Sequence, residues 1–75
     1  MDRMEKLDII ADILRGKRQD AKEHLKSLER ALTIAYEVTN DKDAIKGICE
    51  EMEKERRTIE AANLGLHIVD AARNE

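Results

Sequence analysis

The sequence contains no proline, tryptophan or phenylalanine, and Tyr36 is its single aromatic residue. The absence of proline removes the residue that most strongly interrupts helices. Charged residues make up 41% of the 75 positions, and alanine, leucine and isoleucine supply most of the apolar ones. This composition is typical of long helices and coiled coils, so we expect an all-α protein.

Long apolar runs and paired cysteines are also missing. The longest uninterrupted apolar run is three residues, which argues against a signal peptide or a membrane span in this sequence. Cys49 has no second cysteine to pair with, which excludes an internal disulfide and fits a reducing compartment. We therefore expect a cytoplasmic location and no membrane partner.

The residue combinations that catalysis or cofactor binding needs are absent. The three glycines are isolated, which excludes a glycine-rich phosphate loop. His24 and His67 have no second metal ligand at helical spacing, and Ser27 has no histidine and acid arranged around it. The Glu-x-x-His pairs of di-metal helical bundles are also absent. We expect no enzyme activity, no catalytic residue, no cofactor and no metal site.

Apolar residues at a seven-residue spacing organise the second half of the chain. Two neighbouring lines form the seam of a long amphipathic helix over about residues 43–73: Ile45, Met52, Ile59, Leu66 and Arg73 on one, and Ile48, Glu55, Ala62 and Val69 on the other. Glu55 is the one carboxylate that points inward. A buried polar residue of this kind most often sets register or oligomeric state.

The first half repeats this spacing and predicts a helix over about residues 3–38. Its seam lines are Met4, Ala11, Arg18, Leu25 and Leu32, and Leu7, Leu14, Ala21, Leu28 and Ala35. Gly16 is the one place where this helix could instead kink, or break to give three helices. The seven-residue phase crosses Gly16 unchanged, which favours one helix.

A polar cluster at residues 39–42 predicts the turn, with Asn40 or Asp41 as the N-cap of the following helix. The chain is then a single antiparallel helical hairpin over residues 1–75, in which facing residues have numbers that sum to about 81. This register places Arg18 beside Asn63, and it places Lys26 beside Glu55. It also places His24 beside Arg57, and Cys49 as a small buried residue next to the seam.

Four large apolar residues fall outside both seams near the open end of the hairpin: Ile9, Ile13, Leu64 and Ile68. A 75-residue chain buries only roughly 60% of its unfolded surface when it folds alone, and short domains often gain stability by oligomerisation. These residues therefore predict an oligomer or partner interface. The simplest assembly is a two-fold dimer that forms a four-helix bundle.

These features favour a small non-catalytic regulatory or adaptor protein that acts by protein-protein contact with an unidentified partner, for example as an inhibitor of a larger host factor. The alternative is an RNA-binding dimer of helical hairpins in the manner of Rop, an architectural comparison that no motif of this sequence carries. The nucleic-acid face would then be the stripe Lys22, Lys26 and Arg30. The net charge of -3, with both signs scattered along the chain, favours the first hypothesis.

Overall fold

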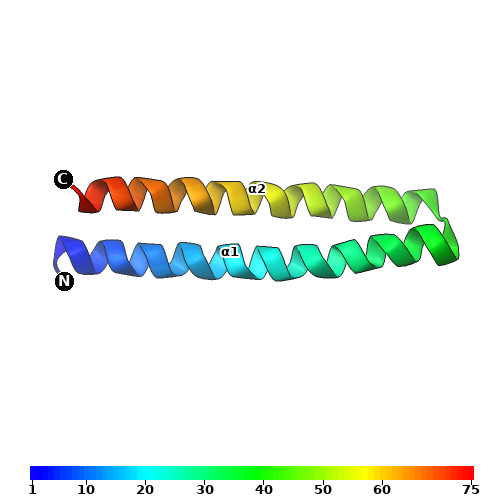
Figure 1. The fold of residues 1–75 in the computed structure, drawn as a ribbon, viewed down its shortest axis with the longest axis horizontal. Helices are drawn as coiled ribbons and strands as arrows, with labels where there is room; N and C mark the ends of the chain where they lie inside the picture. The colour runs from blue at the N-terminus through cyan, green and yellow to red at the C-terminus, as the bar shows by residue number, and fades with distance from the viewer.

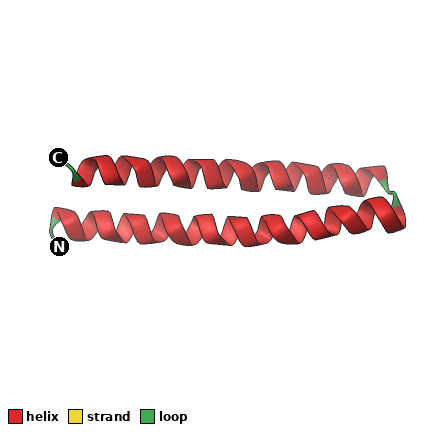
Figure 2. Ribbon diagram, viewed as in Figure 1, coloured by secondary structure: helices red, strands yellow, loops and turns green.

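The computed structural model describes residues 1–75 and shows two long helices joined by a tight turn. The elements in chain order are α1 (Arg3–Ile34), the π-helical turn η1 (Ala35–Thr39) and α2 (Lys42–Arg73). The helices lie antiparallel, and the two termini lie at the same end (Figure 1). Only the termini and the short connection are not helical (Figure 2). The predicted all-α helical hairpin is confirmed.

Both long helices begin at a capping aspartate, which the sequence predicts for α2. The Asp2 carboxylate accepts a hydrogen bond from the backbone N–H of Glu5 at 2.8 Å. The Asp41 carboxylate accepts from the N–H groups of Asp43 at 3.0 Å and Ala44 at 3.4 Å. These bonds satisfy backbone donors that the first helical turn leaves without a partner.

Gly16 lies inside α1, which continues through it without a break. This excludes the three-helix arrangement. A Cβ atom added at Gly16 would meet no other atom within 4 Å, so this position carries no packing reason for a glycine. The register of the seam therefore outweighs the local weakness of one glycine.

Replacing Gly16 with alanine should stabilise the protein by about 1 kcal/mol, because glycine loses more backbone freedom in a helix. For a domain of this size the melting temperature should rise by roughly 4–8 °C, measured by circular dichroism at one protein concentration. Gly65→Ala provides the comparison. Its new Cβ would lie 2.8 Å from Leu14 Cδ1, so the gain there should be smaller or absent. A loss of stability in Gly16→Ala would contradict the uninterrupted helix.

The turn closes α1 with a π-helical segment, which the sequence does not predict. The expected first helix extends to Val38, whereas α1 ends at Ile34 and η1 follows. Asn40 then takes a left-handed conformation with φ 49°, and its N–H donates to the Ala35 carbonyl at 2.6 Å. Asparagine is one of the few residues that adopt this conformation at low cost.

Asn40→Ala should therefore cost about 1 kcal/mol, because alanine has a Cβ and no local hydrogen-bonding group to offset the left-handed backbone. Asn40→Gly should keep the wild-type stability or slightly exceed it. Urea unfolding of the two variants at equal concentration distinguishes these outcomes. If both variants unfolded at the same urea concentration, the left-handed residue would not be what shapes this turn.

The buried core is thin and follows the predicted seam. Six residues are buried, and all six lie on the predicted seam lines: Ala11, Ala21, Ala35, Met52, Ala62 and Val69. Four of them are alanine, which lets the two helices approach closely. Gly65 also lies against the Leu14 side chain. A core made mainly of methyl groups supplies little apolar burial compared with one made of leucine or phenylalanine.

Contacts between the helices confirm part of the predicted register and correct part of it. Arg18 Nη1 donates to Asn63 Oδ1 at 2.9 Å, as predicted. His24 was expected beside Arg57, and Glu55 beside Lys26. Both predictions are wrong, because His24 Nδ1 and Glu55 Oε1 lie 3.5 Å apart. The facing positions shift by about half a turn between these two contacts.

Cys49 is exposed, which corrects the prediction that it is a small buried residue. It directly follows the seam residue Ile48, and this position lies at the border of a core that is too thin to cover it.

The open end of the hairpin is joined by two ion pairs. Arg3 Nη2 lies 2.8 Å from Glu75 Oε2 and also donates to the Ala72 carbonyl at 3.1 Å. Arg73 pairs with Asp8. Arg3, Glu75 and Asp8 are mostly exposed, so each pair adds only about 0–1 kcal/mol. They fix how the ends meet and contribute little to stability.

Candidate interaction surfaces

Large apolar side chains remain exposed along the hairpin. The four predicted interface residues are exposed to 44% (Ile9), 54% (Ile13), 62% (Leu64) and 60% (Ile68). Ile10 and Ile34, at 46% and 57%, are exposed as well. Ten large apolar residues are exposed in all, whereas only six residues, four of them alanine, are buried, so the surface is the candidate functional site.

The sequence register tells which side of the hairpin each exposed residue occupies. A residue directly before a seam residue is rotated by about 100° to one side, and a residue directly after it is rotated by about 100° to the other side. In two antiparallel helices, the residues that directly precede the seam residues lie on the same broad side of the pair in both helices. Residues midway between seam lines lie on the outer edges.

One broad side is the apolar face, which we define by six residues that each directly precede a seam residue: Ile10, Ile13, Ile34, Ala61, Gly65 and Ile68. The opposite side is the charged face, defined by six residues that each directly follow one: Arg15, Lys22, Glu29, Glu53, Arg56 and Glu60. Ile9 and Leu64 belong to the outer edges. The four predicted residues are thus divided between the apolar face and the edges.

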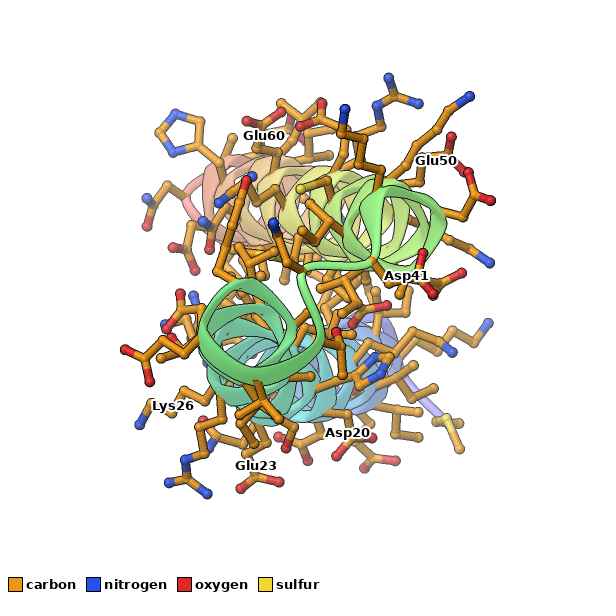
Figure 3. The ribbon with its side chains drawn as sticks, turned by 90° about the vertical axis from the view of Figure 1, so that its right-hand side faces the viewer. Asp20, Glu23, Lys26, Asp41, Glu50 and Glu60 are labelled. Carbon is orange, nitrogen blue, oxygen red and sulfur yellow. The ribbon has the colours of Figure 1, made fainter.

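Figure 3 shows this arrangement in a view along the hairpin. Glu23, which shares a seven-residue line with Ile9, points away from α2, and Glu50, on the line of Leu64, points away from α1. Asp20, on the line of Ile13, and Lys26 leave α1 on different sides. The view agrees with the division into two broad sides and two edges.

The middle of the apolar face is polar. A shallow open depression there is lined by residues of both helices: Lys17, Asp20, Ala21, His24, Glu55 and Thr58. The Glu55 side chain is only 16% exposed and lies 3.5 Å from His24, which is half exposed. Isoleucines lie toward both ends of α1, so the face has a polar centre between two apolar regions.

This polar centre has few of the features of a reactive site. Its two acids, Asp20 and Glu55, and its one imidazole have no cysteine or serine beside them, and the hydroxyl of Thr58 donates to the Lys54 carbonyl at 3.2 Å. No group of three or more His, Cys, Asp or Glu side chains is placed to hold a metal ion. None of the helices has the length and apolar content that crossing a membrane requires.

The basic stripe considered for nucleic acid is interrupted by acids. Lys22 and Lys26 line a second depression together with Glu23 and Glu29. Arg30 follows Lys26 at the next turn of α1, on the outer edge. With carboxylates between its lysines, this surface has no continuous positive field that phosphates would follow.

The interface predicted from the sequence does not include Ile10 and Ile34, although their position in the seven-residue register indicates that they are exposed. Each directly precedes a seam residue, as Ile13 and Ile68 do. Carrying the seven-residue register outward from the seam would have grouped these four residues and separated them from Ile9 and Leu64.

Comparison with protein-family models, with curated proteins and with solved structures found no match.

Proposed function

We propose that this chain is a small non-catalytic regulatory or adaptor protein, which pairs with a second copy and acts by contact with another protein. The observation that supports the proposal is the exposed apolar surface on a hairpin with a thin core. Ile13, Ile34 and Ile68 are each more than half exposed, although burying such a side chain is worth roughly 1.5–3 kcal/mol.

A second copy is the simplest cover for this surface. Two hairpins would form a four-helix bundle with a shared core, and closed two-fold pairing is the commonest symmetry of small oligomers. The pairing would also supply the apolar burial that four alanines, one methionine and one valine provide only weakly within one hairpin.

The alternative, an RNA-binding dimer of the Rop type, has less support. The lysines of its candidate face are interleaved with glutamates, and no aromatic side chain stands beside them for base stacking. Electrostatic binding of RNA also falls steeply with salt, which makes the two hypotheses experimentally distinct.

Affinity capture from the native host separates them. The tagged protein should retain one protein partner in a fixed ratio at low and at high salt, and after nuclease treatment. Recovery of RNA that disappears at high salt, with no protein partner, would contradict the proposal and favour the nucleic-acid alternative.

A further inference from the structure

We infer that the apolar face is where the second copy binds, and that the two hairpins meet with their turns at opposite ends. This inference rests on the proposed self-pairing and goes beyond it by assigning the surface and the orientation. In this arrangement α1 packs antiparallel on α1 of the second copy, and α2 packs antiparallel on α2.

Charge selects this face over the opposite one. Twelve charged residues per copy directly follow a seam residue on the charged side, and covering that side would cost several kcal/mol for each charge that is not fully paired. Covering the apolar face instead buries four isoleucines per copy: Ile10, Ile13, Ile34 and Ile68. The side that carries these isoleucines also holds charged residues that directly precede the seam, but only half as many as the opposite side: Arg3, Lys6, Lys17, Asp20, Glu51 and Lys54.

The order of residues along α1 favours opposite ends. When α1 is reversed end for end about residue 22, the residues between 10 and 34 that directly precede the seam meet residues of the same kind, apolar with apolar and polar with polar. Two apolar pairs and two polar pairs then face each other across the two-fold axis: Ile10 with Ile34, Ile13 with Ala31, Lys17 with Ser27, and Asp20 with His24. A helix that matches its own reverse suits an antiparallel neighbour of the same sequence.

The pair nearest the axis is complementary in charge and hydrogen bonding. The Asp20 carboxylate would face His24 of the second copy, an acceptor opposite a donor, and the two-fold symmetry forms this pair twice. If the turns met at the same end, Asp20 would instead lie opposite Ala61 of the second copy, whose side chain has no hydrogen-bond donor.

Size and shape permit the contact. The hairpin measures 54 × 14 × 14 Å between Cα atoms, so one broad side offers on the order of 750 Å² before side chains widen it. Stable interfaces bury about 800 Å² per partner. On α2, Thr58 lies opposite Ala61 of the second copy, and these small residues allow the two copies of α2 to approach closely at mid-length. Farther out, Gly65 lies opposite Lys54, and Ile68 lies opposite Glu51.

Thiol crosslinking tests both the face and the orientation. On a Cys49→Ser background, Ile10→Cys and Ile34→Cys are combined in one chain and treated with a short bis-maleimide. The two thiols are about 36 Å apart along α1, so the reagent cannot join them within one hairpin. We expect a covalent dimer that needs both cysteines, because position 10 meets only position 34 of the second copy.

The matched control moves both cysteines back by one residue. Ile9→Cys with Thr33→Cys keeps the same separation but leaves the apolar face, and it should give little covalent dimer. A covalent dimer from Ile10→Cys or Ile34→Cys alone would overturn the orientation. A dimer by sedimentation with no crosslink from the Ile10/Ile34 pair would overturn the inference and leave self-pairing intact. A monomer by sedimentation would overturn both.

Discussion

Placing two glutamates on the apolar face, by Ile13→Glu with Ile68→Glu, should dissociate the dimer. Each dimer would lose four buried isoleucines, worth roughly 1.5–3 kcal/mol apiece before the cost of association is subtracted. Since 1.4 kcal/mol is tenfold in affinity, we expect the dissociation constant to rise at least about a thousandfold.

The control changes the net charge equally at the outer edges. Ile9→Glu with Leu64→Glu replaces two exposed apolar residues, at 44% and 62%, that the second copy does not cover in the proposed dimer. Sedimentation velocity should report a monomer for the first variant and a dimer for the control. If both variants behaved alike, the apolar face would not differ from the edges in its role, and the assignment of the interface would be wrong.

Met52→Ala should cost about 2–5 kcal/mol of unfolding free energy. Met52 is the largest of the six buried residues, and its truncation would leave a cavity among neighbours that are mostly too small to fill it. A domain of this length has roughly 4–11 kcal/mol in total, so the variant should be partly unfolded at 37 °C. Urea denaturation followed by circular dichroism gives the value directly.

Met4→Ala serves as the comparison, because it removes the same side chain from a position that is 49% exposed at the open end. Its effect should stay within about 0.5 kcal/mol. Equal losses at the two positions would mean that Met52 lies outside the core, which would contradict the predicted seam.

The fold follows closely from the seven-residue spacing. Every buried residue, from Ala11 to Val69, lies on a seam line that the sequence defines, and the line through Ala11 and Arg18 crosses Gly16 without a shift in phase. Such repetition is a strong signal, because each seam position repeats the same constraint on one helical face. The Asp41 cap is a similarly local and reliable feature.

The π-helical turn and the details of pairing could not be predicted. No residue between Ala35 and Thr39 distinguishes a π-helical turn from an α-helical one, since the difference depends on how the chain must approach Asn40. The pairing of His24 with Glu55 depends on a small axial shift between the helices, which a seven-residue pattern does not resolve. Cys49 was predicted to be buried because it lies next to the seam, but the narrow interface between two helices covers the seam residues and leaves this neighbouring position exposed.

The candidate surface was only partly predictable. The sequence identifies Ile13 and Ile68 as apolar residues outside the seam, but it does so equally for Ile9 and Leu64. Their division between a broad face and the outer edges requires the packing of α1 on α2. The polar centre around Asp20 and His24 likewise becomes one feature only when both helices are in place.

Sedimentation equilibrium of the wild-type chain tests the central claim most directly. We expect a mass of twice the 8.6 kDa of one chain at low micromolar concentration, in low and in high salt, since the proposed interface is mainly apolar. A mass of 8.6 kDa that persists at a concentration about 100-fold higher would contradict the claim that a second copy covers this hairpin.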